Sequence, residues 1–96
     1  MVRSIVATIR VKEGQNAQFE AVASRLVEAV RANEPGCLLY TLSRGEDEQT
    51  YVFMERYADE EATKAHRASE HFKTYGRQMG EFMDGAPIVL RMNEVV

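Results

Sequence analysis

The two histidines of the chain, His66 and His71, follow an apolar segment that contains Glu55. An imidazole exchanges protons near neutral pH, and a carboxyl group shielded from water has a raised pKa. Residues 51–72 therefore concentrate groups that could act as acids or bases beside aromatic side chains. No other part of the sequence combines these features. We expect any catalytic centre to lie in this stretch.

Each of the three groups also has a structural interpretation. His66 could be a general acid or base, or a half-buried histidine bonded to a backbone carbonyl or to Glu55. His71 falls in the first turn of a predicted helix, where the helix dipole disfavours the imidazolium and would keep a base neutral. It could equally be a cap or a surface residue. Glu55 is a buried carboxyl group only if its face of the strand points toward the helices.

The spacing of the histidines argues against a metal site. On one helix, side chains five residues apart point ~140° apart, whereas joint metal binding favours a spacing of four. A break near Ala68 could bring them together, but we predict no metal. The sequence also lacks a phosphate-binding glycine loop and a dinucleotide fingerprint.

Aromatic and methionine side chains near these groups could line an apolar cavity suited to a flat ring, or could simply be core. The predicted lining residues are Tyr40, Tyr57, Phe72, Tyr75, Met79 and Phe82. Gly76 and Gly80, one helical turn apart, indicate either a loosely held lid or close backbone packing against the sheet. Of these two interpretations we favour packing.

Periodicity predicts the elements that position these residues. Apolar residues alternate over 2–11, 37–44, 49–57 and 88–94, which is typical of strands. A helical stripe spans 15–33 and ends at Pro35. Asp59 and Ser69 are predicted N-caps of two further helices, the second running to about Asp84. The order β-α-β-β-α-α-β indicates an α+β, ferredoxin-like fold: a four-stranded antiparallel sheet with helices on one face.

Both middle strands carry apolar groups on both faces. Leu39 and Met54, for example, oppose Tyr40 and Phe53. A sheet covered by helices on one side needs only one apolar face, so the second predicts a homodimer formed through the exposed sheet face.

Composition excludes several classes of protein. The 96 residues are expected to form one domain, 1–96. A net charge of −3 argues against nucleic-acid binding. No apolar run is long enough for a membrane span or a signal peptide, and the single Cys37 cannot form an internal disulfide. These features predict a cytoplasmic protein without nucleic-acid or membrane partners.

Four segments resemble the antibiotic biosynthesis monooxygenase (ABM) family: 34–40 (EPGCLLY), 53–57 (FMERY), 59–66 (DEEATKAH) and 69–72 (SEHF). The resemblance implies a dimeric α+β barrel with one pocket per subunit. It also implies oxygenase chemistry without flavin, haem or metal, in which a deprotonated phenol or quinol itself reduces O₂. By position, His66, His71 and Glu55 match the family's recurrent pattern. The absence of Trp, and Ala7 and Thr8 in the first strand, depart from the haem-degrading members and argue against haem degradation.

Three functions are compatible with this resemblance. The leading one is a cofactor-independent monooxygenase that oxidises a quinol-like or polyphenolic small molecule with O₂. The second is an acid/base isomerase of a small hydroxyketone, of the autoinducer-processing type. A phosphorylated substrate of such an enzyme would need a cation at the pocket mouth, for which the sequence offers Arg10, Arg56, Lys73 and Arg91. The third is a dimeric binding or stress protein without activity.

Overall fold

The computed structural model describes all residues, 1–96, and has the predicted order of elements. Each strand bound lies within one residue of the predicted one, whereas the last helix ends at Gly80 rather than near Asp84. The elements are β1 (Arg3–Arg10), α1 (Asn16–Asn33), β2 (Cys37–Arg44), β3 (Thr50–Tyr57), α2 (Glu60–Ala68), α3 (Glu70–Gly80) and β4 (Ile88–Asn93).

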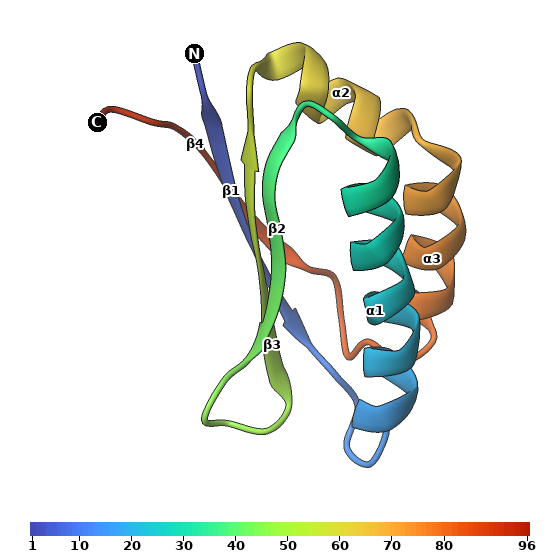
Figure 1. Ribbon diagram of the computed structural model, residues 1–96. Helices are drawn as coiled ribbons and strands as arrows, with labels where there is room; N and C mark the ends of the chain where they lie inside the picture. The colour runs from blue at the N-terminus through green and yellow to red at the C-terminus, as the bar shows by residue number, and fades with distance from the viewer.

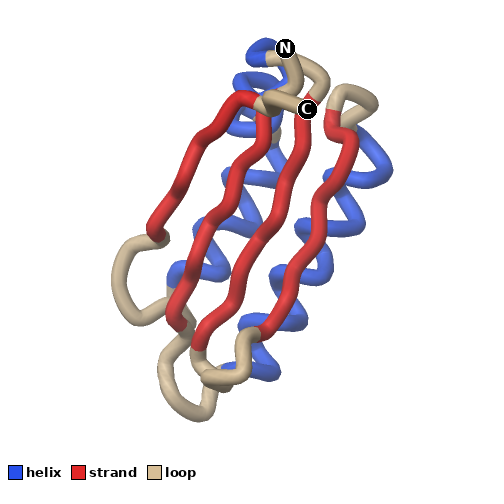
Figure 2. Tube along the Cα trace, turned by 90° about the vertical axis from the view of Figure 1, so that its left-hand side faces the viewer, coloured by secondary structure: helices blue, strands red, loops and turns tan.

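The strands form one sheet in the order β2-β3-β1-β4, and every neighbouring pair is antiparallel. All three helices lie on one face of the sheet (Figure 1), and Figure 2 shows the strands in front of them. This is the predicted α+β, ferredoxin-like fold. No helix is both long enough and apolar enough to cross a membrane.

Local sequence explains where the helices begin and end. α1 buries a stripe that includes Phe19, Leu26 and Val30, and it ends where Pro35 cannot continue the helix. As predicted, the Asp59 side chain accepts a hydrogen bond from the Ala62 amide, and Ser69 accepts one from the Phe72 amide. The Ser69 backbone is extended, which separates α2 from α3 and turns the chain between them.

α3 ends early because the chain beyond Gly80 pairs with the end of the first strand. The Lys12 amide donates to the Phe82 carbonyl at 2.9 Å, and the Asp84 amide donates to the Arg10 carbonyl at 2.7 Å. Val11 and Met83 form an isolated antiparallel bridge. This strand-like contact holds residues 82–84 beside residues 10–12, at the C-terminal end of β1.

The two faces of the sheet differ in burial. Ile5, Ile9 and Phe53 face the helices and belong to the buried core, whereas side chains of opposite parity face away. On that outer face Met54 is 45% exposed and Leu90 is 58% exposed. The second apolar face expected from the sequence is therefore present.

Candidate active site

β3 turns Glu55 toward the helices. Tyr51, Phe53, Glu55 and Tyr57 alternate onto the covered face, and Glu55 is 8% exposed. The Tyr57 hydroxyl donates a hydrogen bond to Glu55 Oε1 at 2.6 Å. Burial raises the pKa of Glu55 above its usual 4.5, and this effect outweighs the opposing Tyr57 hydrogen bond. The orientation that the sequence left open is thus the buried one, and the group is suited to carrying a proton.

His66 projects from α2 into a cluster of aromatic rings. It is 5% exposed, and its ring centroid lies 5.2 Å from Tyr40, 5.5 Å from Tyr57 and 4.7 Å from Phe72. Burial lowers the pKa of His66 below 6.5, although the nearby Glu34 carboxylate opposes the shift. Nδ1 is bonded to Glu34, whereas Nε2 has no hydrogen-bond partner in the protein. A neutral imidazole of this kind has one nitrogen available to a ligand.

Glu34, at the C-terminus of α1, joins the two histidines. Its Oε2 lies 3.0 Å from His66 Nδ1 and 2.5 Å from His71 Nε2, and its side chain is 8% exposed. The break at Ser69 therefore does bring the histidines together, through a carboxylate that was not predicted as a site residue. The partner of His66 Nδ1 is Glu34 rather than a backbone carbonyl or Glu55, the two partners considered for a structural histidine.

The same three residues are the ones that could hold a metal ion. One donor atom from each of Glu34, His66 and His71 lies within 4.8 Å of the others. Two imidazoles and a carboxylate are ligands that zinc and ferrous iron accept. In this arrangement, however, the donors are hydrogen-bonded to one another, and neither Glu34 nor His71 lines the cavity described next. Cofactor-free chemistry remains a prediction that chelation can test.

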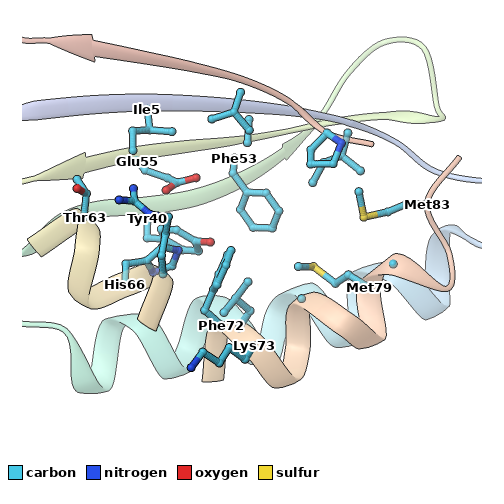
Figure 3. Close-up of a pocket in the computed structure, with 18 of the residues that line it drawn as sticks. Ile5, Tyr40, Phe53, Glu55, Thr63, His66, Phe72, Lys73, Met79 and Met83 are labelled. Atoms are coloured by element: carbon cyan, nitrogen blue, oxygen red, sulfur yellow. The ribbon is translucent and has the colours of Figure 1, made fainter. Parts of the chain in front are cut away.

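A cavity of about 560 Å³ lies between the sheet and the helices α2 and α3. Figure 3 shows Tyr40, Glu55 and His66 at one end and Met79 and Met83 at the other. The predicted residues that line it are Tyr40, Tyr57, Phe72 and Met79, together with His66 and Glu55.

Three residues predicted for the site do not line this cavity. Tyr75 and Phe82 pack against the hydrophobic core instead, and His71 reaches Glu34 behind the cavity wall. The predicted apolar stripe of this helix is broader than the cavity wall: Phe72, Met79 and Met83 line the cavity, whereas Tyr75 and Phe82 do not. Sequence reasoning also missed Ile5, Ala7, Phe53 and Val89, whose strand alternation would have placed them on the same side.

Gly76 and Gly80 line the cavity as well. A Cβ atom added to either glycine would meet no atom within 4 Å. The interpretation that they allow close backbone packing against the sheet is therefore wrong. Their missing side chains instead leave space open along α3.

A different glycine marks a close contact near the histidines. A Cβ atom at Gly36 would lie 2.7 Å from Cβ of Ala62 on α2. The Gly36 carbonyl also accepts a hydrogen bond from the Ala58 amide at 2.8 Å. The turn that leads into β2 thus touches α2 directly, two residues after Glu34.

Comparison with known proteins agrees with this fold. Residues 3–78 match the family described as "Antibiotic biosynthesis monooxygenase". A crystal structure of a "putative antibiotic biosynthesis monooxygenase" from Caulobacter crescentus CB15 is 40% identical, with a TM-score of 0.95, covering 99% of this chain and 91% of that one. Rv0793 from Mycobacterium tuberculosis, 24% identical, shares the fold with a TM-score of 0.92 over 100% of this chain and 97% of its own.

A curated relative extends the match. "Putative monooxygenase YcnE" from Bacillus subtilis is 29% identical over 85 residues, which cover 88% of this chain and 90% of the relative. Since the family match spans most of the residues that form the sheet, the helices and the site, the chain belongs to the antibiotic biosynthesis monooxygenase family.

Proposed function

We propose that the protein is a cofactor-independent monooxygenase that oxidises a quinol-like or polyphenolic small molecule with O₂. The observation that carries the proposal is the environment of the His66 ring. Its Nδ1 is held by a buried carboxylate, and its ring borders an apolar cavity with Nε2 unbonded. This arrangement can remove a proton from a phenol in surroundings that favour a neutral base.

The reaction begins when a phenolic hydroxyl donates its proton to His66 Nε2. Glu34 stabilises the imidazolium, because its negative charge lies 3.0 Å from Nδ1. The electron-rich anion then reduces O₂, and a carbon–oxygen bond forms to give a peroxide anion. Protonated Glu55 can supply a proton to the peroxide. The O–O bond then breaks as the carbon that bears the peroxide loses its hydrogen as a proton to the Glu55 carboxylate. One oxygen atom stays on that carbon as a carbonyl, and the other leaves as hydroxide, which takes the proton held by His66 to become water. The substrate thus provides all four electrons.

The cavity supports a ring-shaped substrate. Tyr40, Phe53 and Phe72 present aromatic surface, and Met79 and Met83 close the end opposite His66. Aromatic rings and thioethers pack favourably against flat apolar molecules. The proposed partners are therefore a small aromatic substrate and O₂; the predicted cytoplasmic location remains a prediction.

Oxygen uptake tests the proposal. The purified protein is treated with a chelator and assayed in an oxygen electrode with a panel of quinols and anthrone-like phenols. We expect uptake that falls at least ~10²-fold in His66→Ala. His71→Ala is the matched control, since it also removes a bond to Glu34 but leaves the cavity wall intact, and it should retain most of the turnover.

Other results would favour the alternative functions. Proton exchange or isomerisation of a hydroxyketone without uptake would indicate the isomerase, and retention of a bound aromatic without turnover would indicate a binding protein. Uptake that appears only after a metal is added back would contradict the cofactor-free reaction and assign Glu34, His66 and His71 as ligands.

The proposal includes a homodimer through the outer sheet face, where Leu39, Met54 and Leu90 are 41%, 45% and 58% exposed. Burial of these apolar groups against a second sheet would remove them from water. Leu39→Lys should shift sedimentation from dimer to monomer, while Ser24→Lys on the exposed side of α1 should not. An unchanged profile for Leu39→Lys would count against this interface.

A further inference from the structure

The cationic side chains of the protein are unevenly distributed. Five of the twelve lysines and arginines form ion pairs, as Arg10 does with Asp47 and Arg56 does with Glu94. Lys12 and Arg31 donate hydrogen bonds to backbone carbonyls instead. Arg25, Arg67, Lys73, Arg77 and Arg91 form neither an ion pair nor a side-chain hydrogen bond. All of these except Arg25 line the cavity. In a chain of net charge −3, the unpaired positive charge is thus gathered at one place.

Three elements around the cavity supply these charges, and Arg67 is the one on α2. Lys73 and Arg77 are one turn apart on α3, on the same stripe as Gly76 and Gly80. Arg91 lies on the edge strand β4, opposite Ile5 in the register, and Ile5 in turn pairs with Glu55 on its other side. The opening therefore lies between the bare glycines of α3 and the exposed strand β4.

The charges also reach the acid–base groups. The positive charge of Arg91 acts on the pKa of Glu55, and that of Arg67 acts on the pKa of His66. Lys73 contributes less positive charge to the cavity, because Figure 3 shows its amine turned away from the aromatic residues. Arg67, Arg77 and Arg91 thus form the cationic rim of the cavity.

We propose that this rim binds an anionic substituent, a carboxylate, sulfate or phosphate, of a substrate whose aromatic body occupies the cavity. Glu55 is the only acidic residue that lines the cavity, and Tyr57 already donates to it. Unpaired cations beside an apolar space create a positive potential that attracts anions and orients them. Arginine matches the planar oxygens of a carboxylate or the face of a phosphate.

This inference rests on the proposed function, since it assigns the substrate class of the same cavity. It also changes the set of cations available to an anionic substrate. Of those suggested by the sequence, Arg10 and Arg56 are occupied by ion pairs away from the cavity, whereas Lys73 and Arg91 do line it. Arg67 and Arg77 replace the two that are occupied.

A matched pair of fluorescent probes tests the rim without requiring turnover. 8-Anilinonaphthalene-1-sulfonate and N-phenyl-1-naphthylamine share one aromatic body, but only the first carries an anion. We expect the sulfonate to bind the protein about tenfold more tightly, the effect of one charge-assisted hydrogen bond. The double variant Arg77→Gln/Arg91→Gln should lose that preference, and added salt should weaken only the anionic probe.

Two controls locate the effect. Arg25→Gln removes an unpaired arginine that does not line the cavity and should leave both affinities unchanged. Gly76→Leu should block both probes, because a leucine there would enter the open space, whereas Gln78→Leu on the same helix should block neither. Equal affinities of the two probes, or an equal loss in Arg25→Gln, would overturn the inference.

Competition then identifies the anion. 1-Naphthoate, 1-naphthyl sulfate and 1-naphthyl phosphate are compared as competitors, with inorganic phosphate as the reference without a ring. A preference among the three ring compounds supports the inference and names the substituent, whereas equally strong competition by inorganic phosphate would contradict a combined ring-and-anion site. Because binding alone is measured, absence of oxygen uptake would overturn the proposed oxygenase but not this result.

Discussion

Two carboxyl groups are buried at the same end of the molecule, and their surroundings differ. The Glu34 side chain lies behind the cavity wall and contacts two histidines, which can become cations. Glu55 borders the cavity, and its only side-chain hydrogen bond comes from the phenol of Tyr57, whose own pKa is raised by burial and by the charge of Glu55. The same chemical group is thus placed to support positive charge on His66 in one region and to hold a proton in the other.

Of the substitutions that test this difference, replacement of Glu34 should lower turnover the most. Glu34→Gln retains the size of the side chain but removes the charge that stabilises the His66 imidazolium. We expect kcat to fall roughly 10²-fold with little change in KM, because Glu34 does not contact the cavity. Glu34 also raises the pKa of His66, so the acid limb of the kcat/KM profile should move to lower pH. A uniform loss of rate without that shift would indicate a merely structural role.

A smaller kinetic effect is expected at Glu55. Glu55→Gln should lower kcat about tenfold, less than loss of a full general acid, because the amide still donates a hydrogen bond. Activity that needs protonated Glu55 falls as pH rises through its raised pKa. The variant should lack this basic limb, which steady-state rates across pH would reveal. Persistence of the limb would assign it to another group.

Glu55 and His66 should have opposite effects on how thermal stability depends on pH. The raised pKa of Glu55 means that the folded state binds more protons, so stability falls as pH rises above 4.5 through the folded pKa. The lowered pKa of His66 has the opposite consequence, a loss of stability as pH falls below 6.5. Glu55→Gln should therefore gain Tm relative to the unmodified protein at pH 8 but not at pH 4. A constant difference across that range would contradict the assignment.

The smallest effect is expected from the Tyr57 hydroxyl. Tyr57→Phe removes the only hydrogen bond to Glu55 and should cost about 1–2 kcal/mol in the free energy of unfolding, measured by urea denaturation. Because that bond lowers the pKa of Glu55, its loss should move the basic limb to higher pH. Tyr75→Phe, which lies outside the cavity, serves as the control.

Most of the fold followed from periodicity and from a few capping residues. Strand alternation placed Phe53 and Met54 on opposite faces of β3 without showing which face the helices cover, and Asp59 and Ser69 marked the helix starts correctly. The end of α3 could not be predicted in the same way. It depends on the pairing of Val11 with Met83, which joins segments far apart in the chain.

The site was predictable only in part, for a related reason. His66 and Glu55 carry the right chemistry, but the orientation of Glu55 could not be predicted, because both faces of its strand carry apolar residues. Glu34 contacts His66 and His71 across 32 and 37 positions, and its local setting before Pro35 is explained fully by a helix stop. Tyr75 and Phe82 failed as lining residues because a helical stripe defines a face more broadly than a cavity does.

The contact between Gly36 and Ala62 has a consequence for how such a site can vary. Two residues without functional groups determine how closely α2 approaches the segment that carries Glu34, since a methyl group at position 36 would collide with one at position 62. The space between these two residues holds one methyl group, which either of them could carry. Exchange of the two residue types would conserve that volume, whereas alanine at both positions would force α2 away and separate His66 from its carboxylate. Variation in this region is thus limited by the combined size of a pair rather than by either residue alone.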